Sequence, residues 1–435
     1  MKRITTKTFL EKSYVNILLI IFGGIVLHAP VSVMLGVLWP DYGLLIKSWK
    51  EVLMLIAGLL ALYLLYKNKK FSILKDPVIV LTAVYAVLHL LLLGYQPQGW
   101  TPALAGLAID LRYALFFALV YIAMRLYPGY RHKFIKVGIA GAFVVLVFSI
   151  LQVFFLPYDF LKYLGYSKYN IVPYLLIDQN YDYIRINSTL RGPNPLGAYA
   201  VMALVMVTSA IIHGKIKQER LNRLSTVVLV FGALVALWYS YSRSALLAAV
   251  VCVFAVVAYT VGEKVRRRPW MVWAGVVAVL SIGGVVASNS QLVSNVLLHD
   301  NPSNSEAYGS NLGHVSSLKD GFGQMKRQPL GAGIGSTGSA SILSGKNEII
   351  ENQFLYIAHE VGWLGLGLFL SIYGWVLWKL WQLRADWFAL GTFVSGIGIG
   401  LICLVLPILV DDTVAIIWWG LAALALFPSK KTEVL

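Results

Sequence analysis

The sequence predicts an all-α integral membrane protein with about twelve transmembrane helices. Of its 435 residues, 58% are hydrophobic and only 13% are charged, whereas soluble domains carry about 25% charged residues. Apolar runs of about twenty residues, the length of a membrane-spanning helix, recur along the whole chain. Most Lys and Arg residues stand in short clusters between these runs. This pattern excludes a disordered chain, a coiled coil and a cytosolic enzyme.

Twelve apolar runs fit membrane spans within a single polytopic domain over residues 1–435. The first run is long and no small-residue cleavage site follows it, so we expect a retained span and not a cleaved signal peptide. The runs lie near 15–37, 50–66, 77–95, 101–125, 134–156, 194–213, 225–240, 244–261, 270–288, 352–376, 388–408 and 413–427.

The basic clusters predict the orientation, because cytoplasmic loops of membrane proteins carry an excess of Lys and Arg. With the N-terminus inside, the even-numbered connections and the C-terminal tail should be basic. All of them are, at 67–70, 125–136, 215–223, 263–268, 379–384 and 430–431. Both termini are therefore expected in the cytoplasm. The net charge of +16 follows from this topology, and no nucleic-acid partner is predicted.

Two long connections are expected on the external side. The loop over 157–193 holds seven tyrosines, which could stack on sugar rings or form an interfacial aromatic belt. The loop over 289–351 includes 314–328, a candidate short amphipathic helix at the membrane surface, and the glycine-rich turn segment 329–339. Connections this long are usually functional. No internal repeat supports the layout of many transporters.

Ionisable residues at membrane depth are costly, so each one is a candidate functional residue. No HExxH, P-loop or dinucleotide motif is present, so we predict no metal, cofactor or nucleotide hydrolysis. Cys252 and Cys403 lie within apolar runs and form no disulfide framework or zinc motif. The candidates are Asp110, Arg112, Arg185, Arg191, Arg243, Glu351, His359, Glu360, Asp411 and Asp412.

Two arginines are candidate anion ligands. Arg191 opens RGPNPLGAYA at the start of the sixth span, where Asn194 can cap the helix. A cation beside a helix N-terminus suits an anionic group; the alternative is an arginine that snorkels at the membrane boundary. Arg243 lies with Ser242 in a recessed hairpin, YSYSRSALL. It needs an anionic partner, either a carboxylate of the protein or a substrate phosphate.

A second group of candidates stands where the long loop enters the tenth span. A carboxylate is favourable at a helix start, so Glu351 either stabilises the helix start or acts as a general base near the external surface. Two turns further along, His359 could share a helix face with Asn352, and Glu360 follows it.

The remaining acidic candidates have simpler interpretations. Asp110 and Arg112 lie two residues apart in the fourth span, so they point to different sides of the helix and need not pair. Structural polar packing is the favoured interpretation for both. Asp411 and Asp412 stand in the tight turn between the last two spans, where capping of the helix explains them.

Three motifs together resemble the O-antigen ligase and O-antigen polymerase superfamily. They are LRGPNPLGAYA (190–200), SYSRSALLA (240–248), and RQPLGAGIGSTG (327–338) followed by ENQFLYIAHEVGWLGLGLF (351–369). Each motif is loose when taken alone. Their order, spacing and expected position on one side of the membrane make the resemblance specific, and it covers about residues 185–375.

The resemblance implies a bacterial cytoplasmic (inner) membrane enzyme of cell-surface polysaccharide and lipopolysaccharide biosynthesis, with an external active site. Members of the superfamily transfer a glycan from an undecaprenyl diphosphate carrier to a hydroxyl acceptor, without a metal. Arg191 and Arg243 would then hold the diphosphate, with Arg112 or Arg185 as helpers, since side chains must neutralise the leaving group. Supporting roles would fall to Asn194, Ser242, His359 and Glu360.

One position departs from the ligase pattern. Ligases carry His-Asn at the start of the span after the long loop, and the histidine is the presumed base. Here the pair is Glu351-Asn352, and His359 comes too late in the sequence to replace the histidine. A partly buried glutamate can still act as a base.

Two alternatives stay open. A ligase transfers the glycan to a lipid or protein hydroxyl, whereas a polymerase transfers it to another lipid-linked glycan. An acidic residue at position 351 resembles the pattern of polysaccharide polymerases more than that of ligases. A lipid-linked glycan flippase or another transporter, embedded in the same membrane lipids, explains the spans and arginines equally well, but explains the one-sided polar motifs less well.

Overall fold

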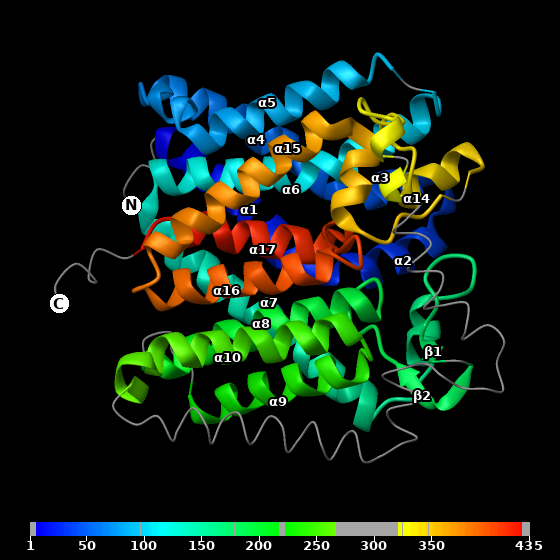
Figure 1. Ribbon diagram of the computed structural model, residues 1–435, viewed down its shortest axis with the longest axis vertical. Coiled ribbons are helices and arrows are strands. Elements are labelled where there is room, and N and C mark those ends of the chain that lie inside the picture. Colours follow the sequence, from blue (N-terminus) through cyan, green and yellow to red (C-terminus); the bar gives the residue numbers. More distant parts are fainter. Residues whose placement is uncertain are drawn as a thin grey trace.

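The computed structural model describes residues 6–95, 97–177, 179–216, 222–266, 321–323, 325–346 and 348–428. Its helices lie side by side with roughly parallel axes in one bundle (Figure 1). They are α1 (Thr6–Gly24), α2 (His28–Leu38), α3 (Gly43–Lys47), α4 (Trp49–Lys67), α5 (Pro77–Leu92), α6 (Trp100–Leu126), α7 (Arg131–Phe154), α8 (Pro193–Ile212), α9 (Arg223–Tyr239), α10 (Arg243–Arg266), α14 (Gly338–Ser341), α15 (Gln353–Gln382), α16 (Trp387–Cys403) and α17 (Asp412–Ala425).

The helix positions agree with the predicted apolar runs wherever the structure describes the chain. The shorter apolar helices α5, α9, α16 and α17 also coincide with predicted spans, whereas the predicted ninth span, 270–288, lies outside the described residues. A helical membrane protein is thereby confirmed, and the total of twelve spans stays a prediction. Seven helical segments of the described ranges are long and apolar enough to cross a membrane: Phe9–Leu38, Trp49–Lys67, Trp100–Leu126, Pro128–Phe154, Pro193–Ile212, Arg243–Thr260 and Gln353–Gln382.

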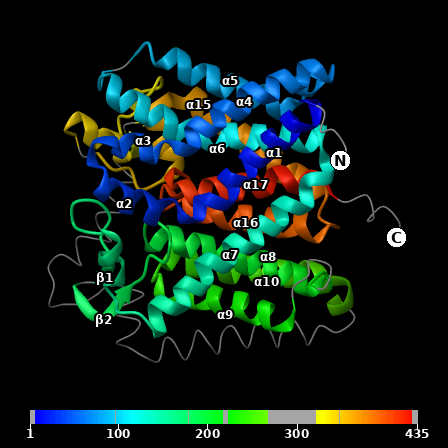
Figure 2. The ribbon, with the colours of Figure 1, turned by 180° about the vertical axis from the view of Figure 1, so that it is seen from behind.

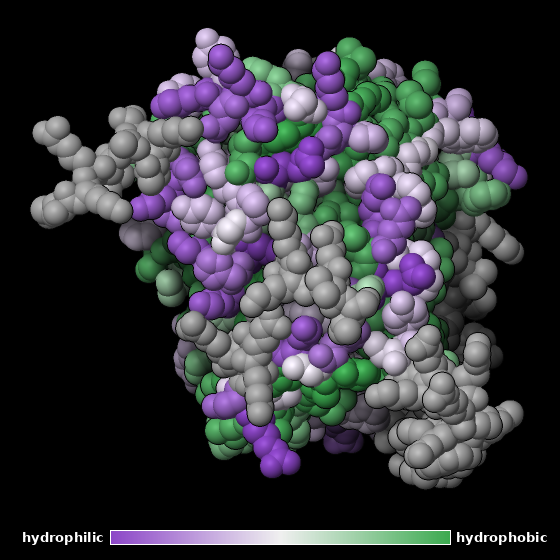
Figure 3. Space-filling view, turned by 90° about the vertical axis from the view of Figure 1, so that its left-hand side faces the viewer, coloured by the Kyte–Doolittle hydropathy of each residue, from purple (hydrophilic) through white to green (hydrophobic). Residues whose placement is uncertain are grey.

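The two ends of the bundle differ in character. Helix α1 begins and α17 ends at one end, whereas α3, α14 and the strands lie at the other (Figures 1 and 2). Figure 3 looks onto the first end and shows hydrophilic side chains spread across it. This arrangement is the one expected if the first end faces the cytoplasm, and we call the opposite end the outer end.

The core and the outer surface of the bundle are both apolar. Trp418 and Trp419 of α17 are fully buried, and the ring of Trp419 stacks on Tyr113 of α6 with centroids 5.6 Å apart. On the outside of α4, Leu55 and Leu59 are 68% and 63% exposed. Such side chains suit lipid, which is as apolar as leucine.

The tyrosine-rich loop contains a feature that the all-α prediction missed. Strands β1 (Leu175–Ile177) and β2 (Asn180–Arg185) form a short antiparallel hairpin. Aromatic and β-branched side chains in NYDYIR favour strand conformation. The next residue after β2, Ile186, donates its N–H to the Tyr239 carbonyl at 3.1 Å.

The predicted amphipathic helix at 314–328 lies partly outside the described residues. Within it, residues 321–323 and 325–327 are helical.

Candidate functional site

Three helix N-termini converge on one turn at the outer end of the bundle. Helices α8, α15 and α17 all contact the 3-10 turn Ile408–Val410. The amide of Asn352 donates to the Leu404 carbonyl at 2.7 Å, and the Leu409 N–H donates to the side chain of Gln353 at 2.9 Å. Helix N-termini carry partial positive charge and helix C-termini partial negative charge. The C-terminus of α16 also meets this turn, so the three N-termini leave the junction electropositive by the surplus over that one C-terminus.

A buried charged cluster lies beside the same turn, and we call it the α17 cluster: His28, Lys50, Glu51, Arg112 and Asp412. The Asp412 carboxylate contacts His28 Nε2 at 2.9 Å and Lys50 Nζ at 3.1 Å, and it also pairs with Arg112. Glu51 lies 3.2 Å from Lys50 and 3.8 Å from Arg112. Lys50 and Arg112 are only 3% and 6% exposed. Buried charges persist when they are paired in this way.

Arg191 stands at the rim of the α17 cluster. Its positive charge acts on Lys50, Arg112 and Asp411. Its side chain is exposed, and within the described ranges no hydrogen bond or ion pair to the guanidinium is found. Since Glu51 and Asp412 already balance the buried cations, Arg191 is the cation best placed to receive an incoming anion.

Asp411 holds the turn in place. Its carboxylate caps α17 by accepting from the N–H groups of Thr413 and Val414, each at 3.0 Å. Burial raises the pKa of the Asp411 carboxyl, while the cap hydrogen bonds and the charges of Arg191 and Arg112 oppose that rise. The predicted capping role of Asp411 is confirmed. The capping interpretation of Asp412 is wrong, because its carboxylate is the centre of the charged cluster.

Arg185 joins two of the sequence motifs. Its Nε donates to the Ser240 carbonyl at 2.8 Å, and Nη2 donates to the side-chain oxygen of Asn194 at 2.7 Å. Burial, together with the nearby charge of Arg243, lowers the pKa of Arg185 to about 10, so it remains charged at neutral pH. The guanidinium therefore holds the motif around Arg191 against the hairpin that carries Arg243, the half-buried first residue of α10.

The predicted cap by Asn194 is wrong. Helix α8 begins at Pro193 behind Gly192, and no side-chain cap is formed there. Proline favours the first helical position because its φ is already fixed near the helical value. The helix therefore starts two residues earlier than a cap at Asn194 would give, and the Asn194 oxygen accepts from Arg185 instead.

Ser242 supports the same hairpin from within. It is buried, its N–H donates to Ser240 Oγ at 3.2 Å, and its hydroxyl lies 3.4 Å from Ser244 Oγ.

Glu351 and Asn352 have different roles at the start of α15. Asn352 caps α15, because its side-chain oxygen accepts from the N–H groups of Phe354 and Leu355 at 2.9 and 3.0 Å. The cap is therefore provided by Asn352. Glu351 is half-buried at the junction, and its role as general base stays a prediction.

The other candidates lie deeper in the bundle. Asp110 and Arg112 do not pair with each other: Arg112 belongs to the α17 cluster, and Asp110 hydrogen-bonds Glu360. His359 is buried, with Nε2 4.0 Å from the Glu348 carboxylate.

Sequence reasoning missed His28, Lys50 and Glu51. A signal was present for one of them. Lys50 stands at the start of the second predicted span and Lys47 just before it, at the end that the topology places outside, where basic residues are unusual.

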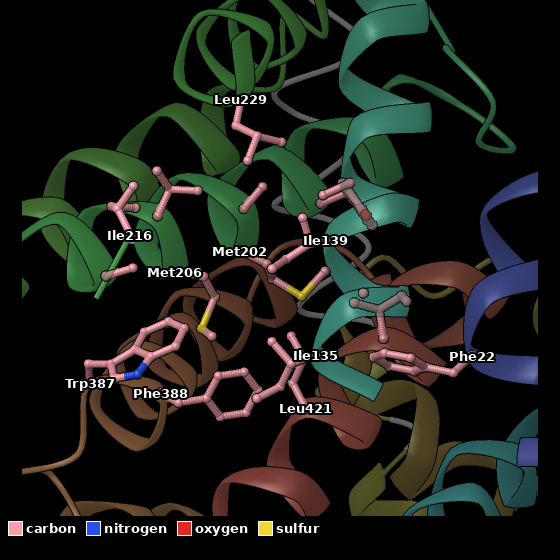
Figure 4. Close-up of a pocket in the computed structure, with 17 residues that line it drawn as sticks. Phe22, Ile135, Ile139, Met202, Met206, Ile216, Leu229, Trp387, Phe388 and Leu421 are labelled. Carbon is pink, nitrogen blue, oxygen red and sulfur yellow. The ribbon is translucent and has the colours of Figure 1, made fainter. Parts of the chain in front are cut away.

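A separate apolar cavity of about 100 Å³ lies between α7, α8 and α16 (Figure 4). Ile135 and Ile139 of α7 and Met202 and Met206 of α8 line it. Its described lining residues carry no charge, so it does not belong to the charged site.

Two comparisons with known proteins bear on this site. Residues 227–370 match a protein-family model described as O-antigen ligase. That region contains Arg243, Glu351 and Asn352, whereas Arg191 lies upstream of it. A curated O-antigen polymerase of Salmonella muenchen is 24% identical over 281 residues, which are 62% of this chain and 66% of the relative. The match thus spans just under two thirds of that relative's length.

Proposed function

We propose that this chain, a member of the O-antigen ligase and polymerase superfamily, transfers a glycan from undecaprenyl diphosphate to a hydroxyl group at its outer end. The observation that carries the proposal is the exposed Arg191, placed where α8, α15 and α17 begin and beside a charged cluster that is already balanced. An exposed cation among helix N-termini suits a diphosphate. The product would be cell-surface polysaccharide.

Arg191 and the first turn of α8 would hold the diphosphate, and Arg243 would contribute a second cation. As the glycan leaves, negative charge builds on the diphosphate oxygen. Donors that are already oriented toward that charge lower the barrier to the reaction. Arg185 would keep the two arginines in register through Ser240 and Asn194. Two of its five N–H donors bind the protein, and the others would remain for a helper contact to the donor.

Glu351 would accept the proton of the acceptor hydroxyl. The acceptor oxygen forms a bond to the anomeric carbon, and the bond from that carbon to the diphosphate oxygen breaks. Undecaprenyl diphosphate leaves with the electron pair. Attack on an α-linked donor from the opposite face inverts the configuration. Asn352 would place Glu351 by fixing the first turn of α15.

The acceptor separates two forms of this function. A ligase uses a lipid or protein hydroxyl, as the description of the matching family suggests. A polymerase uses a second lipid-linked glycan, and the description of the Salmonella relative favours this form.

The test is transfer by the purified protein in detergent with undecaprenyl diphosphate glycan as donor. Ladders of longer lipid-linked glycan identify a polymerase, and a single transfer to an added lipid or protein acceptor identifies a ligase. Arg191→Ala and Arg243→Ala should each lower the rate about 10²-fold or more. Lys168→Ala, which removes an exposed cation from the same end, should not. Donor movement across liposomes without transfer would instead support a transporter.

A further inference from the structure

The glycine-rich segment 329–338 fits into a kink of α15. At Gly362 the backbone leaves the helical conformation, with φ 69° and ψ −170°. The segment supplies partners for the backbone groups that the kink frees: the Ala332 N–H donates to the His359 carbonyl at 2.6 Å, and the Trp363 N–H donates to the Pro329 carbonyl at 2.9 Å. A broken helix at membrane depth needs such partners.

The backbone of the segment also lies in direct contact with the backbone of α6. A Cβ on Gly335, whose φ is +77°, would stand 2.1 Å from the Pro102 carbonyl oxygen. A Cβ on Gly362 would stand 2.3 Å from the Pro329 carbonyl oxygen. Only glycine allows both the backbone conformation and the contact, so the position of this segment is closely defined.

The side chain of Glu360, on α15, binds the backbone of segment 329–338. It is fully buried, and each of its two oxygens accepts one backbone N–H: Oε2 from Gly335 at 3.1 Å and Oε1 from Thr337 at 3.3 Å. Both oxygens must therefore be acceptors. A carboxylate offers two acceptors, whereas a primary amide offers one and places a donor at the other position.

Asp110 of α6 meets Glu360 from the other side. It is 5% exposed and hydrogen-bonds Glu360. Its Oδ2 also lies 3.7 Å from Nε2 of the fully buried His89. Nδ1 of that histidine lies 2.8 Å from the Tyr85 carbonyl oxygen, so Nδ1 carries the hydrogen and Nε2 presents a lone pair. At 3.7 Å the imidazole forms no hydrogen bond to Asp110, so the contact that decides is the one to Glu360. Two carboxyl groups can hydrogen-bond only when one of them is protonated, and both Glu360 oxygens already accept N–H groups, so the proton belongs to Asp110.

We propose that Asp110 and Glu360 share one proton, held by Asp110, and that the ionised Glu360 is a positioning residue that clamps segment 329–338 between α6 and α15. The clamp extends to the outer loop, because the Gly338 N–H and the Thr337 hydroxyl both reach the Glu348 carbonyl, at 2.8 and 2.9 Å. Residue 348 lies three positions before Glu351. The clamp is independent of the reaction that the protein catalyses.

The test measures whether segment 329–338 stays in place, from the rate at which a buried cysteine introduced into it reacts with maleimide. Ser336 is 2% exposed, and Ser336→Cys is a small change. Cys252 and Cys403 are both buried, and protein without the reporter gives the background. Maleimide labelling of Ser336→Cys should be slow in the parent protein and about tenfold or more faster with Glu360→Gln. This substitution removes one charge-assisted hydrogen bond and places the amide N–H₂ group against a backbone N–H, so that two donors face each other.

Asp110→Asn is the matched variant. Its amide N–H₂ can donate to Glu360 as the protonated acid does, so labelling should stay within about threefold of the parent. Equal acceleration by both substitutions, or protection of the reporter in Glu360→Gln, would overturn the proposal. Should Glu360→Gln fail to fold, the yield of monodisperse protein becomes the readout. Normal yield for Asp110→Asn alone supports the proton assignment, and equal loss in both variants refutes it.

Discussion

Asp412→Asn tests whether the α17 cluster depends on its charge balance. The substitution keeps the size of the side chain but removes the negative charge that His28, Lys50 and Arg112 share. Glu51 then remains as the single carboxylate of the cluster for two buried cations. Breaking a buried ion pair costs about 3–5 kcal/mol. The retained amide oxygen recovers part of this, so we expect a loss of about 2–4 kcal/mol.

The assay is thermal unfolding in detergent, followed by tryptophan fluorescence. A loss of this size corresponds to a fall of roughly 4 °C or more in the apparent midpoint. Asp41→Asn removes the same charge from an exposed position at the same end and should leave the midpoint unchanged. Adding Lys50→Met to Asp412→Asn removes the surplus cation and should restore part of the stability. A midpoint for Asp412→Asn equal to that of Asp41→Asn would show that the cluster contributes no stability.

Two further predictions concern the proposed reaction and the packing that supports it. Glu351→Ala should abolish transfer while expression and donor binding persist, because the base is lost and the arginines remain; unchanged turnover would remove Glu351 as the base. Gly197→Ala should lower stability by about 1–3 kcal/mol by overpacking, since a Cβ there would lie 2.9 Å from both Ser240 Oγ and Ala245 Cβ. It should also slow transfer by separating α8 from the Arg243 hairpin; a variant with parent stability and parent rate in the same assays would show that this contact is not needed.

Much of the architecture was predictable because it depends on short stretches of sequence. Hydropathy over about twenty residues locates a helix in a membrane protein, and the described helices lie at the predicted apolar runs. Local chemistry also sets some helix starts, as the caps by Asn352 and Asp411 illustrate. The family resemblance had the same origin, in short motifs that keep their order.

The prediction for Asn194 failed because its capping preference met a competing hydrogen-bond donor from outside the helix. Asn194 is a good capping residue by type, yet Arg185 binds its oxygen. The Asn194 position shows that propensity names the roles a side chain can take, while its neighbours in space decide which role is taken.

By itself, the sequence determined the helical membrane class, the positions of its apolar helices and the motifs by which it resembles the O-antigen ligase and polymerase superfamily. The tertiary structure alone decided that Lys50 and Arg112 share Asp412, and that Asp110 of α6 meets Glu360 of α15. The physical reason is the cost of burying charge. An ionised group in an apolar bundle needs a partner of opposite charge or a hydrogen-bond donor, and that partner comes from whichever helix packs beside it, however far away it lies in the chain.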